Sequence, residues 1–471
     1  MSQKVPLSKV KEIISLYQNK KALPSEVVKE YFEKAKKNEF NSFITLNENI
    51  FEEIEILDKK VKEGKIEGRL FGIPVSVKDN ILVKGLKCTC ASRMLENYIA
   101  PYDATCIERI KKENAIIIGK TNMDEFAMGS SNEYSFFGPA SNPFDKERVP
   151  GGSSGGSAIS VANNESILSL GSDTGGSIRL PASFCGVYGL KPTYGAVSRY
   201  GLVAFASSLD QIGPFSKNIE DLEIIFNVIK GKDERDKTSF NLPEEKRILQ
   251  FPLKIGVLRD SFSEDVDGEI KIHLDEFIKT LEKEKIAIVK EFEMETFQYA
   301  IPVYYIIACA EASSNLARYD GVLYGYKSES ENLWEMYEKT RTEGFGEEVK
   351  RRILLGTFVL RSGYYEEYYL KAQKIRTKIL KEFMKNFENF DLLLMPVSPT
   401  LPFKKGEKLK DPIKMYLSDI FTVSINLSGL PAIAFPYRFS KSGLPVGFQF
   451  VGKFFDEYLF FELLKRIENI F

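Results

Sequence analysis

Two glycine-serine turns lie close together in the chain. The first, GGSSGG, spans residues 151–156, and the second, DTGGS, spans residues 173–177. A helix-like run at 158–163 and an apolar run at 167–170, long enough for a buried strand, lie between them. Because glycine lets the backbone bend sharply or approach a ligand closely, the turns can gather serine hydroxyls and backbone N–H groups in one small volume. An enzyme that attacks a carbonyl and holds the resulting oxyanion needs such groups.

Two other interpretations of this stretch fit the sequence less well. Glycine-serine runs often form flexible linkers, but a linker would not contain an apolar run, nor would SIRLPASFCGVYGLKPTYG, rich in residues that pack, follow it directly. A phosphate-binding loop would require Gly-Lys-Ser/Thr at a fixed spacing, and a dinucleotide site would require an acidic partner. Neither accompanies GGSSGG.

The sequence contains a single histidine, His273. Its neighbours Ile270, Leu274 and Phe277 follow helical spacing, so we expect a half-exposed helix residue and not a catalyst. A Ser-His-Asp triad, a Cys-His nucleophile and a multi-histidine metal site are then excluded. The base for acyl transfer must come from another residue type, and lysine is the obvious candidate.

Lys78 follows the apolar run IPVSV, where we expect the end of a buried strand. Burial disfavours the ammonium form and lowers the pKa of a lysine, so its neutral amine can accept a proton. The alternative is a solvated Lys78 paired with the adjacent Asp79. The lack of a suitable histidine favours the catalytic interpretation.

Three motifs together resemble the amidase signature family, whose members are serine amidases with a Ser–cis-Ser–Lys triad. They are GIPVSVKDN, PGGSSGGSAISVA and GSDTGGSIRLPASFCGVYGLKPTYG, and the resemblance extends over about residues 5–470. It implies that Ser177 is the nucleophile, that Ser153 is a bridging serine after a cis peptide bond, and that Lys78 is the base. It also implies an oxyanion hole formed by backbone N–H groups. Those groups belong to Thr174, Gly175, Gly176 and Ser177.

Further motifs, at 197–216, 310–326, 343–357 and 418–436, resemble the glutaminase subunits of three-subunit tRNA-dependent amidotransferases within this family. Matched onto their glutamine pocket, Arg352 would bind the substrate carboxylate, and Asp419 and Tyr304 would hold the α-amino end. The chemistry agrees, because free glutamine is a zwitterion that needs an opposite charge at each end. Without the resemblance, Arg352 would be a helix-surface arginine beside Arg351, and Asp419 a helix N-cap.

The chain departs from these glutaminase subunits at Ala196, where we expect arginine, but this position lies outside the triad. The resemblance implies that the chain hydrolyses free glutamine and passes ammonia to a second protein, the B subunit of the enzyme. There ammonia would amidate glutamate on tRNA(Gln), or aspartate on tRNA(Asn), after activation by ATP. ATP, Mg²⁺ and most contact with the mischarged tRNA would belong to the B subunit, and a small C subunit would clamp the heterotrimer. No cofactor or metal is expected in this chain.

Two alternatives remain open at this point. A stand-alone amidase of small or apolar amides would share Lys78, Ser153 and Ser177 but would leave Arg352 and Asp419 without charged partners, which is costly. An assembly scaffold with a dead site is the third interpretation, and the intact triad argues against it.

Composition limits the other function classes. Of the 471 residues, 43% are apolar and 28% charged, which is typical of a soluble globular protein, and the net charge of −1 argues against autonomous nucleic-acid binding. No apolar run approaches the roughly 20 residues of a membrane span, and the N-terminus has no signal-peptide core. The five cysteines are too few for a disulfide scaffold, so we expect a cytoplasmic protein.

Strand-like and helix-like segments alternate along the chain, which predicts an α/β fold. We expect one amidase-signature domain over residues 1–471, with a mixed, mostly parallel central sheet covered by helices on both faces. Its parts are N-terminal helices (1–64), catalytic core motifs (65–216), helical insertions with further strands (217–390), and closing strands with a C-terminal helix (391–471). Strands are expected at 72–80, 115–120, 167–173, 254–260, 286–293, 391–396, 432–437 and 446–452. The segment 230–251 is expected to be a surface connection.

Overall fold

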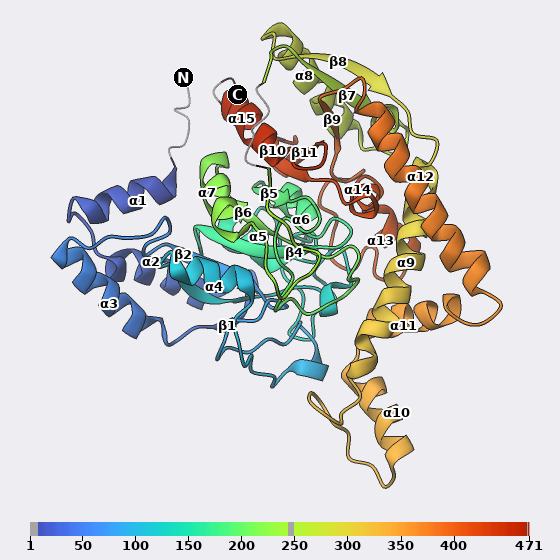
Figure 1. The fold of residues 1–471 in the computed structure, drawn as a ribbon, viewed down its shortest axis with the longest axis horizontal. Helices are drawn as coiled ribbons and strands as arrows, with labels where there is room; N and C mark the ends of the chain where they lie inside the picture. Colours follow the sequence, from blue (N-terminus) through green and yellow to red (C-terminus); the bar gives the residue numbers. More distant parts are fainter. Residues whose placement is uncertain (1–7, 244–248, 469, 471) are drawn as a thin grey trace.

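The computed structural model describes residues 8–243, 249–468 and 470. Residues 1–7 of the expected N-terminal helices, 244–248 of the expected surface connection, and 469 and 471 of the C-terminal helix lie outside the described residues. The fold is a single α/β unit built on one eleven-stranded sheet (Figure 1). The strand order is β1-β3-β2-β4-β6-β5-β10-β11-β9-β7-β8.

The strands are β1 (Phe43–Leu46), β2 (Pro74–Lys78), β3 (Ile116–Thr121), β4 (Leu168–Asp173), β5 (Tyr188–Lys191), β6 (Gln211–Ser216), β7 (Leu253–Leu258), β8 (Ala287–Phe292), β9 (Leu392–Pro396), β10 (Ala432–Phe439) and β11 (Pro445–Val451). The helices are α1 (Lys9–Gln18), α2 (Pro24–Lys37), α3 (Ile50–Glu63), α4 (Thr105–Lys112), α5 (Gly155–Ala162), α6 (Arg179–Phe184), α7 (Ile219–Ile229), α8 (Gly268–Lys283), α9 (Ala300–Asn315), α10 (Leu333–Gly344), α11 (Glu347–Val359), α12 (Lys371–Asn386), α13 (Pro412–Leu417), α14 (Val423–Ser428) and α15 (Glu457–Glu468). All eight expected strands are confirmed.

The expected mixed sheet is confirmed, but the expectation that it is mostly parallel is wrong. Among the strands that the structure describes, only β2–β3, β2–β4, β7–β8 and β7–β9 pair in parallel, and the other neighbouring strands pair antiparallel. The reason is the type of connection. Helical crossovers such as α4 and α8 return the chain in the same direction, whereas the short turn between β10 and β11 makes a hairpin.

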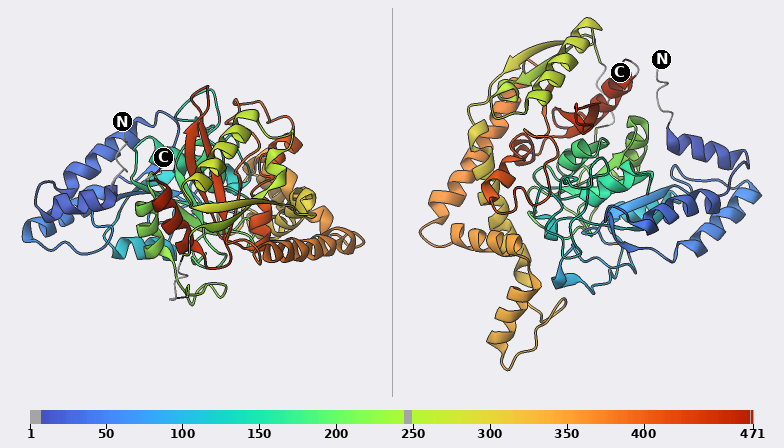
Figure 2. Two further views of the ribbon diagram at one scale, coloured as in Figure 1. Left: turned by 90° about the horizontal axis from the view of Figure 1, so that it is seen from above. Right: turned by 180° about the vertical axis from the view of Figure 1, so that it is seen from behind.

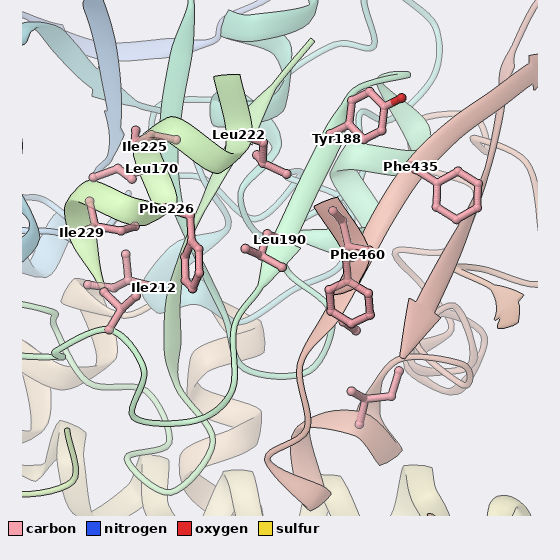
Figure 3. Packing of buried hydrophobic residues seen from close by; sticks show 14 of the residues in the cluster. Leu170, Tyr188, Leu190, Ile212, Leu222, Ile225, Phe226, Ile229, Phe435 and Phe460 are labelled. Carbon is pink, nitrogen blue, oxygen red and sulfur yellow. The ribbon is translucent and has the colours of Figure 1, made fainter. Parts of the chain in front are cut away.

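Helices cover both faces of the central strands, as expected. On one face, α7 packs its apolar side chains onto β4, β5 and β6 (Figure 3). The residues in this contact include Leu170, Leu190, Ile212, Leu222, Ile225 and Phe226. On the other face, Phe215 of β6 belongs to a second core with Ile159 of α5 and with Ile178, which directly precedes α6. Alternating side chains along a strand therefore reach two different cores.

Sequence reasoning missed β1, β5 and β6 as strands, and α6, α10, α13 and α14 as helices. The strands β5 (YGLK) and β6 (QIGPFS) contain glycine or proline, which weaken the sequence signal of a strand. The missed helices are irregular in pattern, and α13 and α14 have only six residues each. The helical insertions expected within 217–390 include α11 and α12, with a π-helical turn, η6 (Tyr365–Leu370), before α12.

His273 lies on a helix, as expected, but its side chain is more buried than the half-exposed position we expected. It lies on α8 with 15% of its side chain exposed, and its Nδ1 is 3.3 Å from Glu276 Oε2.

The five cysteines are buried free thiols. In the described part of the chain, no helix has both the length and the apolarity to cross a membrane.

Candidate active site

Lys78 ends β2, which lies between β3 and β4 in the sheet, and is completely buried. Its Nζ donates hydrogen bonds to Ser153 Oγ at 2.8 Å, to Ser172 Oγ at 3.0 Å and to the Ser172 carbonyl at 3.2 Å. Burial lowers the pKa of Lys78 to about 7, although nearby carboxylates, including Asp124 and Asp173, act in the opposite direction. The predicted contact between Lys78 and Ser153 is therefore present, with an amine that can be neutral.

Lys78 does not form the ion pair with Asp79 that was the alternative expected from the sequence. The Asp79 carboxylate pairs with Lys120 of β3 at 3.0 Å, and both side chains are completely buried. Asp79 also accepts the backbone N–H of Thr89 at 2.9 Å. No carboxylate of the described residues lies within ion-pair distance of Lys78, so its partners are hydroxyl and carbonyl groups. Sequence reasoning missed Lys120. It is the next-to-last residue of β3, and Lys78 is the last residue of the neighbouring β2.

The first glycine-serine turn places Ser153, which is buried, two residues before the start of α5. The peptide bond between Gly152 and Ser153 is cis, as the resemblance implied. The Ser153 carbonyl accepts the backbone N–H of Asp124 at 3.2 Å. A Cβ atom at Gly152 would overlap Asp124 Oδ2 and lie 2.7 Å from the backbone nitrogen of Ser131. Only glycine fits this position, because backbone and a buried carboxylate surround it.

The second turn follows β4 and holds Ser177 against the first turn. The Ser177 carbonyl accepts the backbone N–H of Ser154 at 3.1 Å, and Ser177 is 7% exposed. Among the described residues the Ser177 hydroxyl makes no hydrogen bond, so the structure brings the two turns into contact without closing a Ser153–Ser177 hydrogen bond. The Gly176 N–H donates to Asp173 Oδ1 at 2.9 Å. The Gly176 N–H, one of the four predicted oxyanion-hole donors, is therefore already hydrogen-bonded to a carboxylate.

A buried ion pair anchors this second turn. Arg179 donates from Nε and Nη2 to the Asp173 carboxylate at 3.2 and 3.1 Å, and from Nη1 to Gln449 at 2.9 Å. Burial alone would raise the pKa of Asp173, but Arg179 outweighs it and the pKa falls to about 2. Sequence reasoning missed this pair, although Arg179 is a charge within the otherwise apolar run SIRLPA.

The predicted pocket residue Tyr304 packs directly against the second turn. A Cβ atom at Gly175 would lie 2.5 Å from the Tyr304 ring and 2.6 Å from its hydroxyl. Thr422 Oγ1 donates to the Gly175 carbonyl at 2.5 Å, and Thr174 Oγ1 donates to Asp210 at 2.7 Å. The turn is thus fixed from both sides, and the Tyr304 ring of α9 lies against it at Gly175.

Arg352 lies on the inner face of α11 with 3% of its side chain exposed, so it is not a surface arginine. Its Nε donates to Glu348 Oε1 at 2.8 Å, and the Tyr416 hydroxyl donates to the same oxygen at 3.0 Å. The guanidinium carbon is 5.0 Å from the centre of the Tyr305 ring. The neighbouring Arg351 is 44% exposed, as expected. Sequence reasoning missed Glu348, although it precedes Arg352 by one helical turn.

Asp419 follows α13 and is 6% exposed. Its carboxylate accepts a hydrogen bond from Ser130 Oγ at 2.5 Å, and burial raises its pKa to about 7. It caps no helix through its side chain, since Asp411 is the N-cap of α13 and Thr422 that of α14. Burial also raises the pKa of Tyr304. The charge of Arg352 opposes this shift, and the charge of Asp419 adds to it. The predicted pocket residues are therefore neighbours.

The arrangement can activate a serine hydroxyl and bind a zwitterion beside it. A buried amine contacts one serine, a glycine turn with backbone N–H groups adjoins it, and Tyr304, which lies against that turn, feels the charges of both Arg352 and Asp419. Among the described residues, no group of three or more His, Cys, Asp or Glu side chains is placed to hold a metal ion.

Comparison with known proteins identifies the family. The family model described as Amidase matches residues 26–461. The chain belongs to the amidase family. The family assignment confirms the resemblance found in the three core motifs, and solved amidase-family structures share the fold. A crystal structure of an amidase superimposes with a TM-score of 0.82 at 27% identity, covering 98% of this chain and 99% of that one.

Within the amidase family, the similar proteins include A subunits of glutamyl-tRNA(Gln) amidotransferase. That of Persephonella marina is 52% identical over 98% of this chain and 96% of its own length. That of Carboxydothermus hydrogenoformans is 52% identical over 95% of this chain and 94% of its own length. The crystal structure of the Thermotoga maritima protein of the same name covers 96% of this chain and 94% of its own, with a TM-score of 0.77 and 42% identity.

Proposed function

We propose that this amidase-family chain is the glutaminase subunit of a tRNA-dependent amidotransferase. It hydrolyses glutamine to glutamate and supplies ammonia for the conversion of Glu-tRNA(Gln) to Gln-tRNA(Gln), or of Asp-tRNA(Asn) to Asn-tRNA(Asn). The observation that carries this proposal is the pair of buried opposite charges, Arg352 and Asp419, beside Tyr304 and the Gly175 turn. Full-length similarity to proteins named as the A subunits of such enzymes supports it.

In the proposed reaction, neutral Lys78 takes a proton from Ser153 Oγ, which takes one from Ser177 Oγ. Ser177 Oγ attacks the side-chain amide carbon of glutamine, and the N–H groups of Thr174, Gly175 and Ser177 stabilise the oxyanion. The relay then protonates the departing nitrogen, which leaves as ammonia. Water hydrolyses the γ-glutamyl ester of the serine by the same relay, releasing glutamate and restoring the hydroxyl.

The Arg352 guanidinium would pair with the α-carboxylate of glutamine, and the Asp419 carboxylate with its α-ammonium group. Glu348 holds Arg352 through Nε only, and among the described residues its two terminal nitrogens make no hydrogen bond. Those nitrogens are the ones that a carboxylate binds as a fork. Ser130 occupies one oxygen of Asp419 and leaves the other for the ammonium.

The partners we propose are the B and C subunits of the amidotransferase, which complete a cytoplasmic heterotrimer. ATP and Mg²⁺ would act in the B subunit, where mischarged tRNA would also bind for the most part. This division of labour agrees with the near-neutral charge of the chain.

The deciding experiment measures glutamate release from glutamine by the chain alone, and then with the B and C subunits, ATP, Mg²⁺ and mischarged tRNA. We expect weak hydrolysis alone and a rise on assembly. A chain that ignores glutamine in every mixture but cleaves a simple fatty-acid amide would instead be a stand-alone amidase.

A further inference from the structure

Helix α11 has an outer face that is apolar and exposed. Leu354 is 70% exposed, Phe358 is 41% exposed and Leu355 is 37% exposed. The inner face of the same helix carries buried Arg352 and Gly356. Exposed leucine and phenylalanine side chains grouped on one helix face are typical of a protein–protein interface.

Aromatic rings extend this face beyond the end of α11. The π-helical turn η6 and the residues before it bring Tyr364 and Tyr368 against Phe358, with ring centroids 4.6 and 5.9 Å away. Both tyrosines remain exposed, at 36% and 39%. We call Leu354, Leu355, Phe358, Tyr364 and Tyr368 the outer aromatic surface. Because its rings already pack together, a partner would lose little side-chain freedom on binding them.

A stripe of lysines begins where η6 ends, next to the outer aromatic surface, and continues along α12. Helix α12 directly follows η6. Helices α11 and α12 form the right-hand edge of the molecule in Figure 1, and they lie far from the N-terminal helices in both views of Figure 2. The α12 lysines alternate at spacings of three and four residues, which places them on one helix face. They are Lys371, Lys374, Lys378, Lys381 and Lys385. All are exposed, and none forms an ion pair with any residue that the structure describes.

We propose that the outer aromatic surface and the lysine stripe together dock a partner protein of the same enzyme that presents an apolar patch edged by carboxylates. Aromatic side chains are enriched in the cores of protein interfaces, and unpaired lysines at the rim call for acidic groups opposite them. The relatives are named as one subunit of an amidotransferase, so a partner chain is available to cover this face. The inference rests on the proposed function.

RNA is the other polyanion that a lysine stripe can bind. Stacking of bases, however, needs open ring faces, and here the rings lie against one another beside two leucines. The observations therefore favour a protein surface. Docking there would also fix α11, whose inner face holds Glu348 and Arg352, and this would link assembly to glutamine binding.

The test uses the full chain mixed with the purified B and C subunits, with affinity measured by calorimetry. We expect Leu354→Asp together with Phe358→Asp to weaken binding at least about tenfold, as for residues at the centre of an interface. Leu354→Asp alone, which alters no ring contact, should weaken it in the same direction. The control is Ile56→Asp on α3, which is 55% exposed at the opposite end of the molecule and should bind like the unmodified chain.

A second pair of changes tests the lysine stripe. Lys374→Glu with Lys378→Glu should weaken binding of the partner subunits most at low salt, because screening reduces contacts between exposed charges. Unchanged affinity of both Leu354 variants for the B and C subunits would overturn the inference, and so would a loss confined to tRNA binding. If the unmodified chain itself fails to bind these subunits, the proposed function fails first, and this outcome is distinct from the others.

Discussion

Lys78 can act as a base only while its amine is neutral, and its protonation should set the pH dependence of the reaction. Burial places its pKa at about 7, so the neutral fraction grows as the pH rises through that value. We expect kcat/KM for glutamine to increase with pH on a limb centred at about 7, to which the ionisation of Asp419, whose pKa burial also raises to about 7, contributes in the same direction. Lys78→Arg, which stays charged, should be inactive across the range. A flat profile between about pH 6 and 8 would assign the base to another group.

Ser177→Ala should abolish glutamine hydrolysis. Removal of a serine nucleophile lowers kcat by roughly 10⁶-fold in a well-studied serine hydrolase. Assembly with the partner subunits should survive, since the Ser177 side chain makes no hydrogen bond in the described structure. Substantial activity of this variant in the assembled enzyme would remove Ser177 from the chemistry and favour the dead-site scaffold.

Arg352→Ala should raise KM for glutamine at least about thirtyfold, because truncating one partner of a buried charge pair costs about 2 kcal/mol or more. The matched control is Arg351→Ala, at the adjacent exposed position, which we expect to leave KM nearly unchanged. Steady-state kinetics on both variants gives the comparison. Equal KM values for the two variants would place Arg352 outside the glutamine pocket.

How far the site could be predicted depends on how local each interaction is. The contact of Lys78 with Ser153 was predictable because both belong to long motifs that resemble the amidase signature family, and the resemblance implies that contact. The pairing of Asp79 with Lys120 was not, since it depends on the register of β2 beside β3. Glu348 and Ser130 were missed for a similar reason: each acts by holding another side chain, and the sequence does not show which side chain that is.

At the scale of elements, the turn after β4 depends on the ion pair between Asp173 and Arg179. Arg179→Met would leave the buried Asp173 carboxylate uncompensated, which typically costs about 3–5 kcal/mol. We expect the free energy of unfolding, measured in urea, to fall by that amount and activity to be lost. Adding Asp173→Asn should recover part of the stability. If Arg179→Met alone is as stable as the unmodified chain, the pair does not anchor the turn.

The elements themselves were predictable where the sequence pattern is strong. Apolar runs such as those of β3 and β9 are read directly as buried strands. Strand order was not accessible, because β5 and β10 pair across about 240 residues of sequence. The hairpin of β10 and β11 was also predictable only in part. Both strands were expected, but their direction relative to the rest of the sheet was not.

At the scale of the whole molecule, one sheet joins strands from the early, middle and late parts of the described chain, from β1 at one edge to β8 at the other. We therefore expect calorimetry and far-ultraviolet circular dichroism to give a single unfolding transition with a common midpoint. Fluorescence of the one tryptophan, Trp334, is a poor probe, since it is 80% exposed on α10. Two separated transitions would divide the chain into independent folding units.

The residues proposed for chemistry and for recognition come from different stretches of the chain. Lys78, Ser153 and Ser177 precede residue 178, whereas Tyr304, Arg352 and Asp419 lie in the later, mostly helical segments. Evolution can therefore replace the substrate-binding segments without disturbing the proton relay. Such a separation would let one fold carry different substrate pockets in relatives such as an amidase and the A subunit of a glutamyl-tRNA(Gln) amidotransferase.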